Sequence, residues 1–202
     1  MTTKLLFATN NQGKLKELKQ LLSAAELTAF ELISAADLET PLAEVEEDGE
    51  TFAENAVKKA RAAMEATGYT ALADDSGLEV DALGGAPGVR SARYAGPNKS
   101  DADRNHKLLS ELEGRADRQA RFRCAIALVH VGRPGEPIVC QGQCQGRILD
   151  AVQGEGGFGY DPLFFVESLG KTFAEAEAAE KNAISHRGRA MAELVRYLAS
   201  KA

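Results

Sequence analysis

LADDSG, residues 72–77, is the stretch of sequence on which the fold prediction rests. The apolar run before it, residues 69–73, is typical of a buried strand. Asp, Ser and Gly are turn-forming residues, so the stretch predicts a turn between two strands. The adjacent carboxylates of Asp74 and Asp75 repel each other, and a cation or a shared proton would relieve that repulsion. A divalent metal held by oxygen ligands is one such cation, and a plain turn is the alternative.

The composition predicts one globular domain or two closely joined lobes. The chain has 202 residues, of which 44% are hydrophobic and 27% charged, enough to bury a sizeable core. Its net charge of -6 argues against a nucleic-acid partner, because phosphate backbones select basic faces. No apolar run approaches membrane-spanning length, so no membrane partner is expected. The odd number of cysteines, 3, predicts reduced thiols in a cytoplasmic protein.

A polar loop near the N-terminus separates a predicted strand from a predicted helix. Residues 4–8 form the apolar run, and leucines recur at helical spacing from Leu15 to Leu22. The loop TNNQGK, residues 9–14, would place the open N–H groups of a helix N-terminus where an anion can bind, and Lys14 would add a positive charge. A plain turn with a solvated lysine is the alternative. A Walker P-loop is excluded, because it needs Gly at residue 8 and Ser or Thr at residue 15.

An acidic segment, EVEEDGE at residues 44–50, precedes a second predicted helix. Thr51 and Glu54 form a capping-box pattern, an apolar stripe follows, and Gly68 is placed to end the helix. Acidic residues stabilise a helix N-terminus, which is one explanation for the segment. The other explanation is that one of them binds a metal together with Asp75.

The remaining pattern alternates strands, helices and glycine-rich loops. Residues 78–83 predict a strand that ends at the loop GGAPG, and residues 100–112 predict a helix. Two strands, 122–131 and 138–149, are expected to form a hairpin around RPGEP, residues 133–137.

Two further segments carry candidate binding residues. GEGGFG, residues 154–159, matches the dinucleotide fingerprint, but YDP follows where a helix should begin, so that reading is rejected. Phe158 and Tyr160 could stack on a base, and local packing in a flexible turn is the alternative. His186 and Arg187 lie near the start of the last amphipathic helix, where the dipole disfavours cations, which favours an anionic or carbonyl-bearing ligand.

The C-terminal third also contains a second capping-box pattern. Thr172 and Glu175 have the required spacing, and an Ala- and Glu-rich stretch follows them. This pattern predicts a short helix that begins there and runs to residues 181–182.

Seven motifs stand in the order and spacing of one known family. They are ATNNQGK (8–14), ETFAENA (50–56), ADDSG (73–77), GGAPG (84–88), SARY (91–94), GGFGYDP (156–162) and SHRG (185–188). The chain resembles the inosine/xanthosine triphosphate pyrophosphatases, which remove deaminated purine nucleotides. The resemblance covers nearly the whole chain. It departs at Asn10, where many members have glycine, and at Ala176, where leucine is common.

The resemblance implies an α/β fold with a long central mixed β-sheet and flanking helices. It also implies a single two-lobed domain over residues 1–202, with the active site in the cleft between the lobes, and a homodimer. The implied activity is Mg²⁺-dependent hydrolysis of ITP, dITP and XTP to the nucleoside monophosphate and pyrophosphate. The implied partner is therefore a purine nucleoside triphosphate.

The same resemblance assigns roles to individual residues. Glu47 and Asp75 are the implied Mg²⁺ ligands, and Asp75 is also the proton acceptor for the attacking water. Ser76 is an implied substrate contact and Lys59 an accessory group near the phosphates. The implied triphosphate-binding loop consists of Thr9, Asn10, Asn11, Gln12, Gly13 and Lys14. The implied base- and sugar-proximal pocket consists of Phe158, Gly159, Tyr160, Asp161, Lys181, His186 and Arg187.

Selectivity is expected at the purine 6-position. Inosine and xanthosine carry an acceptor there and adenosine a donor, so donors from Arg187 or backbone N–H groups would be left unpaired by ATP. The alternatives are a related pyrophosphatase acting on another modified or pyrimidine nucleotide, and a nucleotide-binding sensor that does not hydrolyse. A sensor would lack a carboxylate at Glu47 or Asp75, and both are present. A phosphatase releasing orthophosphate would carry an Asp-x-Asp motif at a strand end, which is absent.

Overall fold

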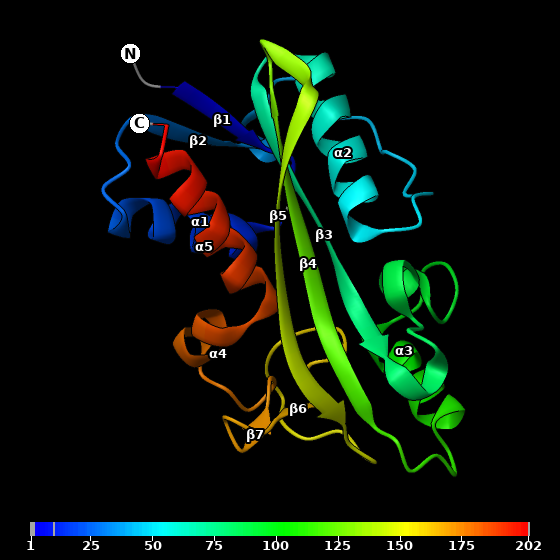
Figure 1. The fold of residues 1–202 in the computed structure, drawn as a ribbon. Coiled ribbons are helices and arrows are strands. Elements are labelled where there is room, and N and C mark those ends of the chain that lie inside the picture. The colour runs from blue at the N-terminus through cyan, green and yellow to red at the C-terminus, as the bar shows by residue number, and fades with distance from the viewer. Residues whose placement is uncertain (1–2, 10, 202) are drawn as a thin grey trace. The chain divides into compact units, whose positions relative to one another are not determined.

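The structure is a computed structural model that describes residues 3–9 and 11–201. Within these residues the chain forms a seven-stranded sheet in the order β2-β1-β3-β4-β5-β6-β7 (Figure 1). Strand β1 (Thr3–Phe7) runs parallel to β2 (Phe30–Ser34) on one side and to β3 (Thr70–Val80) on the other.

The far side of the sheet is antiparallel. β6 (Phe164–Val166) runs antiparallel to β5 (Arg133–Ile148) and to β7 (Lys171–Thr172). β4 (Gln119–His130) lies between β3 and β5. The predicted fold class, α/β with a mixed central sheet and flanking helices, is therefore confirmed.

The chain divides into two compact units. The first contains the described residues up to Asp75, the segment Cys124–Gly142 and the described residues from Arg187 onward. The second contains Ser76–Arg123 and Gln143–His186. Strands β3, β4 and β5 each contribute residues to both units. No helix in the described part of the chain is long and apolar enough to cross a membrane.

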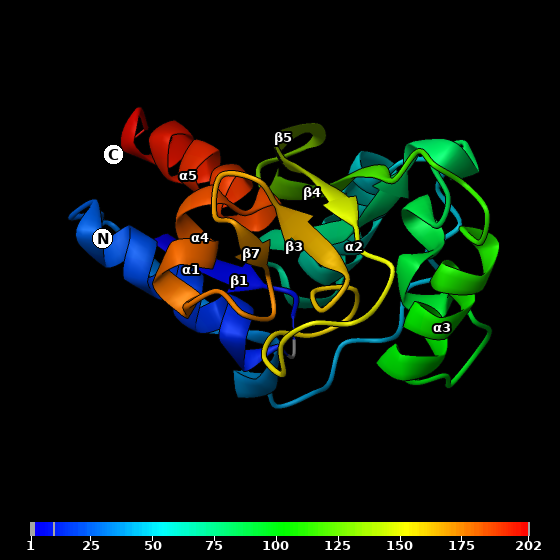
Figure 2. The ribbon, with the colours of Figure 1, turned by 90° about the horizontal axis from the view of Figure 1, so that it is seen from below.

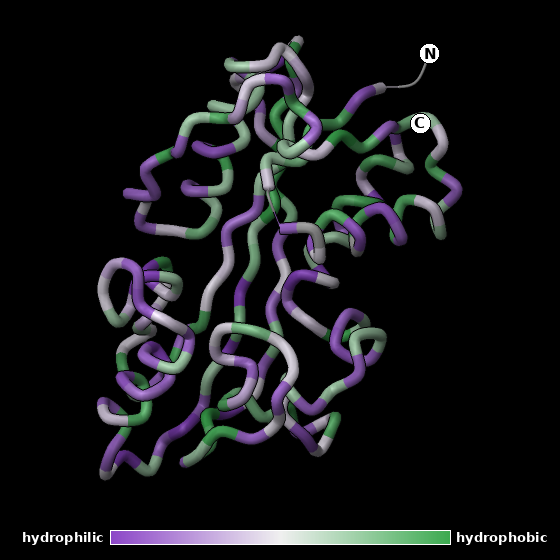
Figure 3. Tube along the Cα trace, turned by 180° about the vertical axis from the view of Figure 1, so that it is seen from behind, coloured by the Kyte–Doolittle hydropathy of each residue, from purple (hydrophilic) through white to green (hydrophobic). Residues whose placement is uncertain are grey.

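The first unit packs helices on both faces of its strands. α1 (Gln12–Ala24) and α5 (His186–Ala199) lie side by side on one face (Figure 1), where their leucines share a core with β1, β3 and β4. α2 (Phe52–Thr67) lies on the other face. Its buried residues, Ala56 and Ala60 among them, are not part of that shared core. Hydrophobic and hydrophilic segments alternate along the coil of the C-terminal helix (Figure 3), as expected for a half-buried helix.

The order of connections places a switch point at the carboxyl end of β1. The chain passes from β1 through α1 to β2 on one side, and from β2 through the 3-10 helix η1 (Ala35–Asp37) and α2 to β3 on the other side. Open α/β sheets bind ligands outside the carboxyl ends of strands at such a point. Phe7, the last residue of β1, pairs with Leu72 of β3, so Asp74 and Asp75 follow directly beyond that end.

The second unit has its own core of apolar and aromatic side chains. α3 (Asp101–Glu111) contributes Leu108, and the ring of Phe122 lies 4.6 Å from that of Phe164 between centroids. The unit also contains α4 (Ala178–Ile184) and the 3-10 helices η2 (Asp81–Leu83) and η3 (Gly88–Arg93). Figure 2 shows α4 beside β7 in this unit.

The predicted turn at residues 74–77 is wrong. Asp74, Asp75, Ser76 and Gly77 lie inside β3, which continues without interruption to Val80. The predicted strand over residues 78–83 is thus the end of the same strand, followed by η2. These turn-forming residues can occupy a buried strand because both carboxylates have partners on neighbouring helices: Lys14 for Asp74 and Asn55 for Asp75. The carboxylates therefore do not have to face water.

The predicted hairpin forms, but its turn is shifted. β4 ends at His130 and β5 begins at Arg133, so Val131 and Gly132 make the turn and RPGEP belongs to β5. Strand β6 pairs with Arg147 and Ile148 of β5, which leaves the start of β5 as an edge. Proline is tolerated at a sheet edge because an N–H is not required there.

The second predicted capping box closes a turn and not a helix. Thr172 N donates to Glu175 Oε2 over 2.9 Å, and Glu175 N donates to Thr172 Oγ1 over 3.3 Å. Phe173 between them is buried in the core of the second unit. The chain cannot turn helical there without withdrawing that ring, and α4 begins only at Ala178.

The cysteine side chains are buried thiols, and their chemistry gives a first testable prediction. Burial, reinforced by the charge of Asp74, raises the pKa of Cys124 to about 12, and burial raises that of Cys140 to about 11. A pKa of about 12 in place of 9.0 lowers the thiolate fraction at pH 8 by about 10³-fold. We expect a chromogenic disulfide reagent to titrate three thiols in urea and to react very slowly with the native protein. Rapid reaction of the native protein at pH 8 would contradict this placement.

Candidate active site

A buried carboxylate paired with two cations lies just beyond the carboxyl end of β1. Lys14 Nζ is 2.7 Å from Asp74 Oδ1 and 2.5 Å from Oδ2, and Arg187 Nε is 3.7 Å from Oδ2. Burial opposes ionisation of Asp74, but the charges of Lys14 and Arg187 hold the pKa of its carboxyl below the ordinary value. A positive charge at the start of a helix is unfavourable, and Asp74 compensates that charge on Arg187 at the start of α5.

A second carboxylate, Asp75, is held by an amide and an ammonium group. Asn55 Nδ2 donates to Asp75 Oδ2 over 3.1 Å, while Gly49 N donates to Asn55 Oδ1 over 2.8 Å. Lys59 Nζ lies 2.5 Å from Glu47 Oε1 and 3.6 Å from Asp75 Oδ1. Burial disfavours the charged form of Lys59, yet the carboxylates of Asp75 and Glu47 raise its pKa above the ordinary value. The structure therefore brings together both predicted metal ligands.

The donor chemistry of this pair fits a magnesium ion. Within residues 3–9 and 11–201, no three His, Cys, Asp or Glu side chains group closely enough to form a metal site by themselves. Mg²⁺, however, is commonly bound through one or two carboxylates and completes its shell with water and substrate phosphate. Glu47 and Asp75 supply two carboxylates that already share one cation, the Lys59 ammonium.

The predicted phosphate loop is organised by the cap of α1. Asn11 is the N-cap, and its side chain accepts from Lys14 N over 3.2 Å. Asn11 N in turn donates to Thr9 Oγ1 over 3.2 Å. Gly13 leaves room for this cap, because a Cβ at that position would lie 3.1 Å from Asn11 Oδ1. Gln12 is the first residue of α1. Asn10, also predicted for this loop, lies outside the described residues.

In the second unit, two of the predicted base-proximal residues, Phe158 and Asp161, lie around the ammonium group of a third, Lys181. Lys181 Nζ lies 2.5 Å from Asp161 Oδ2, and 4.9 Å and 5.2 Å from the ring centroids of Phe158 and Phe173. Phe158 N also donates to Asp161 Oδ2, over 2.8 Å. Phe158 is 53% exposed although it is a large aromatic residue. The arrangement holds an aromatic ring at the surface beside a positive charge.

The remaining predicted residues of this unit have individual partners. Tyr160 is buried and its hydroxyl donates to Ser91 O over 2.9 Å. The His186 ring stacks on Phe122 at 4.8 Å between centroids. Ser76 lies half-buried in β3, directly after Asp75. Tyr160 and His186 thus pack inside the protein. Of the two aromatic residues predicted to stack on a base, only Phe158 is exposed.

Close packing at Gly157 gives a second prediction. Gly157 has φ +72°, and a Cβ there would overlap the Asp161 carboxylate, lying 2.8 Å from Asp161 Cβ. Gly159 also has a positive φ, +63°, but a Cβ there would meet no atom within 4 Å. Both substitutions to alanine carry the backbone cost of about 1–2 kcal/mol. We expect Gly157→Ala to lose about 1 kcal/mol more than Gly159→Ala in urea unfolding, because it also displaces Asp161. Equal losses would show that the Asp161 contact is not constrained.

Three contributions were missed from the sequence. Asn55 orients Asp75, and its signal was a polar residue on the otherwise apolar stripe of α2. Asp74 pairs with Lys14 and Arg187, which the sequence could suggest only as relief of repulsion by some cation. Asp101 and Asn105 contact Gly159 in the predicted base loop, and no local pattern predicted that.

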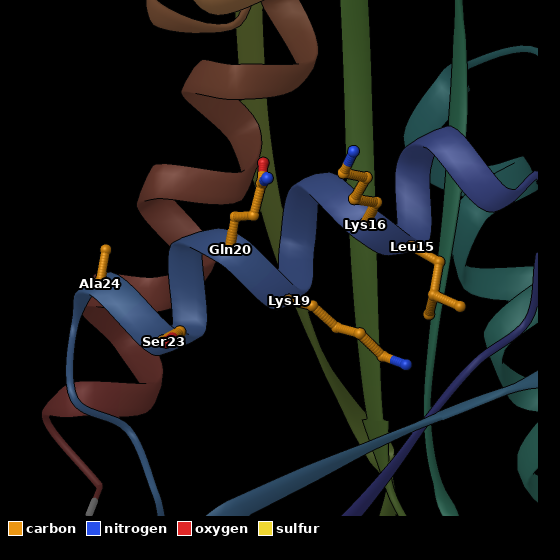
Figure 4. A pocket seen from close by; sticks show the side chains of 6 residues that line it. All are labelled: Leu15, Lys16, Lys19, Gln20, Ser23 and Ala24. Carbon is orange, nitrogen blue, oxygen red and sulfur yellow. The ribbon is translucent and has the colours of Figure 1, made fainter.

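A separate open pocket lies along α1 and has no part in this chemistry (Figure 4). Its volume is about 610 Å³, and it is lined by Leu15, Lys16, Lys19, Gln20, Ser23 and Ala24. Figure 4 shows the side chains of Lys16 and Lys19 extending in different directions. The two charges therefore do not converge on one ligand, and the lining shares no residue with either carboxylate cluster.

Comparison with known proteins gives matches over nearly the whole chain. Two proteins named dITP/XTP pyrophosphatase, from Desulforamulus reducens and Geobacter sulfurreducens, are each 53% identical to it. The alignment with the first relative covers 96% of this chain and 95% of that relative. The alignment with the second covers 97% of this chain and 96% of that relative.

Solved structures agree with these relatives. The HAM1 protein from Coxiella burnetii has a TM-score of 0.91 at 44% identity and covers 98% of this chain and 100% of its own. The Ham1 protein from Staphylococcus aureus has a TM-score of 0.89 at 42% identity, covering 99% of this chain and 100% of its own. Residues 5–197 match the Ham1 family. With the predicted motifs, the fold and these matches in agreement, the chain belongs to the Ham1 family.

Proposed function

We propose that this protein hydrolyses deaminated purine nucleoside triphosphates, namely dITP, XTP and ITP, to the nucleoside monophosphate and pyrophosphate. Relatives that are 53% identical over nearly their full length carry the name dITP/XTP pyrophosphatase. The observation that carries the proposal is the group around Asp75, in which Asn55 and Lys59 hold the carboxylate beside Glu47. An oriented carboxylate with a neighbouring anion is suited to activating water at a phosphorus atom.

We further propose that Glu47 and Asp75 hold Mg²⁺. When bound, Mg²⁺ would neutralise phosphate oxygens and lower the pKa of a bound water. The Lys59 ammonium contacts both carboxylates, so they already face one cation at the place proposed for the metal ion. Asp48 of the acidic segment pairs with Lys58 of α2 at the surface, and that pair contains only one carboxylate, so it offers no comparable site for a divalent cation.

Asp75 is the proposed proton acceptor for the attacking water. Its Oδ2 accepts from Asn55, which fixes the direction of the carboxylate. A positioned general base is worth about 10² to 10⁴ in rate. The leaving pyrophosphate carries a developing negative charge, and Lys14 at the N-terminus of α1 is the proposed group that offsets it. The ion pair with Asp74 holds the Lys14 ammonium in place before substrate binds.

The base is proposed to bind at Phe158. An exposed aromatic ring offers a stacking face, and Lys181 beside it supplies a donor and a positive charge. Purines with a 6-oxo group carry an acceptor where adenine carries a donor. The Lys181 ammonium beside the ring is the proposed donor to this acceptor, and ATP offers it none, which disfavours ATP by a large factor.

We also propose that residues 1–202 act as one catalytic domain in the cytoplasm and assemble as a homodimer. The predicted site residues come from both units, and the cysteines are buried thiols, as expected in a reducing compartment. Light scattering after size exclusion tests the dimer. A monomer at micromolar concentration would contradict it.

The test of the proposed function is a panel of ITP, XTP, dITP, GTP, ATP and dTTP with Mg²⁺, scored by chromatography of the nucleoside monophosphates. We expect rapid monophosphate formation from ITP, XTP and dITP and little from ATP. We also expect little from GTP, which shares the 6-oxo group and differs from inosine by its 2-amino group. Turnover mainly of dTTP or GTP would contradict the substrate class while keeping the reaction. Binding of ITP without turnover would contradict the enzymatic function and favour a nucleotide sensor.

A further inference from the structure

Two side chains of α3 hold the peptide groups of Gly159. Asp101 Oδ2 accepts from Gly159 N over 2.7 Å, and Asn105 Nδ2 donates to Gly159 O over 3.0 Å. Asp101 and Asn105 are four residues apart, so both project from the same face of the helix. We call this pair of contacts the Gly159 clamp.

The clamp is itself held rigidly. Arg104 pairs with the other carboxylate oxygen of Asp101, and its Nη1 donates to Lys99 O over 2.7 Å and to Ala92 O over 3.1 Å. Asn105 is buried, 6% exposed, and its Oδ1 has no hydrogen-bond partner in the described part of the chain. A buried unpaired acceptor is unfavourable. The burial of Asn105 is therefore explained by the hydrogen bond that its NH₂ group donates to the Gly159 carbonyl.

The clamp acts on the loop that carries the exposed aromatic ring. Phe158 N donates to Asp161, Phe158 O accepts from Asp161 N over 3.2 Å, and Gly159 N and Gly159 O bind Asp101 and Asn105. Three contacts with side chains and one backbone hydrogen bond thus determine the backbone path here. Gly159 has φ +63° and no neighbour within 4 Å of a would-be Cβ, so local packing does not fix its conformation.

We propose that Asp101 and Asn105 are positioning residues for base recognition, acting through Gly159 on the placement of the Phe158 ring. The inference rests on the proposed function, in which that ring stacks on the base. Neither residue contacts the reacting phosphates in this account. Loss of the clamp therefore raises the KM for the nucleotide and leaves the chemical step nearly unchanged.

The test compares Asp101→Ala and Asn105→Leu with the conservative variant Asp101→Asn, whose amide oxygen can still accept from Gly159 N. Glu111→Gln is the matched control, a carboxylate-to-amide change on α3 at a residue that pairs with Tyr94 and Lys107. We expect the first two variants to raise the KM for ITP about tenfold, the effect of losing one hydrogen bond to Gly159, which is charge-assisted for Asp101 and neutral for Asn105. We expect kcat to stay within about threefold, and Asp101→Asn and Glu111→Gln to stay near wild type.

Two further readouts separate positioning from general damage. Inorganic tripolyphosphate has no base, so its inhibition constant is expected to stay unchanged in every variant. Hydrogen exchange in the segment 157–161 is expected to become faster in Asp101→Ala and Asn105→Leu, because Gly159 loses its partners. A tripolyphosphate constant that rises with the KM for ITP would overturn the proposal, as would faster exchange without any change in KM.

The clamp can also be tested if the protein turns out not to hydrolyse nucleotides. If the wild type binds ITP without cleaving it, the Kd for ITP from calorimetry replaces the KM, and the same tenfold change in the clamp variants is expected. If exchange at 157–161 does not change in Asp101→Ala, the clamp does not fix the loop and the inference is wrong. That outcome does not depend on whether the wild type hydrolyses any nucleotide.

Discussion

Replacing Asp75 by Asn is expected to lower kcat for ITP about 10² to 10⁴-fold at saturating Mg²⁺. Asn has nearly the same volume and keeps an oxygen for the Asn55 amide, whose Nδ2 lies 3.1 Å from Asp75 Oδ2. It removes the negative charge that accepts the proton and that faces Lys59. The loss should therefore appear in turnover, with the circular dichroism spectrum and the urea midpoint close to those of the wild type.

The matched control is Asp48→Asn. Asp48 belongs to the same acidic segment as Glu47, and its carboxylate pairs with Lys58 at 2.6 Å on the surface. The Lys58 partner lowers the pKa of Asp48, so this carboxylate too is ionised at neutral pH. We expect turnover of Asp48→Asn to stay within about twofold of the wild type, because an exposed ion pair contributes little. Near-normal turnover of Asp75→Asn would remove Asp75 from its role as base.

Replacing Asp74 by Ala is expected to destabilise the protein by about 3 kcal/mol, since breaking a buried ion pair by removing one of its members is strongly destabilising. The side chain of Asp74 is 3% exposed and that of Arg187 9%. Lys14 can turn to solvent more easily, as it is 19% exposed. Most of the loss therefore comes from the buried guanidinium of Arg187. Urea unfolding followed by circular dichroism measures it.

Asp48→Ala is the control for this experiment, because it also breaks a carboxylate–lysine pair but an exposed one. We expect no measurable shift of its urea midpoint. A second variant, Asp74→Asn, keeps the volume and should lose less stability than Asp74→Ala, since an amide oxygen can still accept from Lys14. A loss for Asp74→Ala no larger than that for Asp48→Ala would contradict the buried ion cluster.

Local sequence patterns predicted those elements whose signals are local. α2 and α3 begin after Thr51 and Ser100, where the sequence predicted helix starts, and α1 begins at Gln12, within the predicted polar loop of residues 9–14. α5 begins at His186, slightly earlier than expected. Each of these elements is decided by contacts within about one helical turn, and such contacts are visible in the sequence.

The errors arose where a distant partner decides the conformation. Residues 74–77 look like a turn, but Lys14 and Asn55 are 60 and 20 residues away from the carboxylates they bind. The start of β5 contains prolines that suggest a loop, yet its position at an edge tolerates them. The capping-box pattern of Thr172 and Glu175 predicted a helix start, but Phe173 between them is buried in the core, which prevents the helix from starting there.

The predicted site divides in the same way. The resemblance to the family implied Glu47, Asp75 and Lys59 as site residues, and these three are adjacent in the structure. The orienting groups were not predicted, because they act through single hydrogen bonds between elements: Asn55 holds Asp75, and Asp101 and Asn105 hold Gly159. Sequence spacing alone carries no record of such contacts.

Phosphorus NMR of the ITP reaction with Mg²⁺ shows which phosphate bond the protein cuts. We expect a pyrophosphate resonance and that of inosine monophosphate to grow together from the first time point, with no orthophosphate. Orthophosphate and inosine diphosphate as the first products would contradict the proposed release of pyrophosphate.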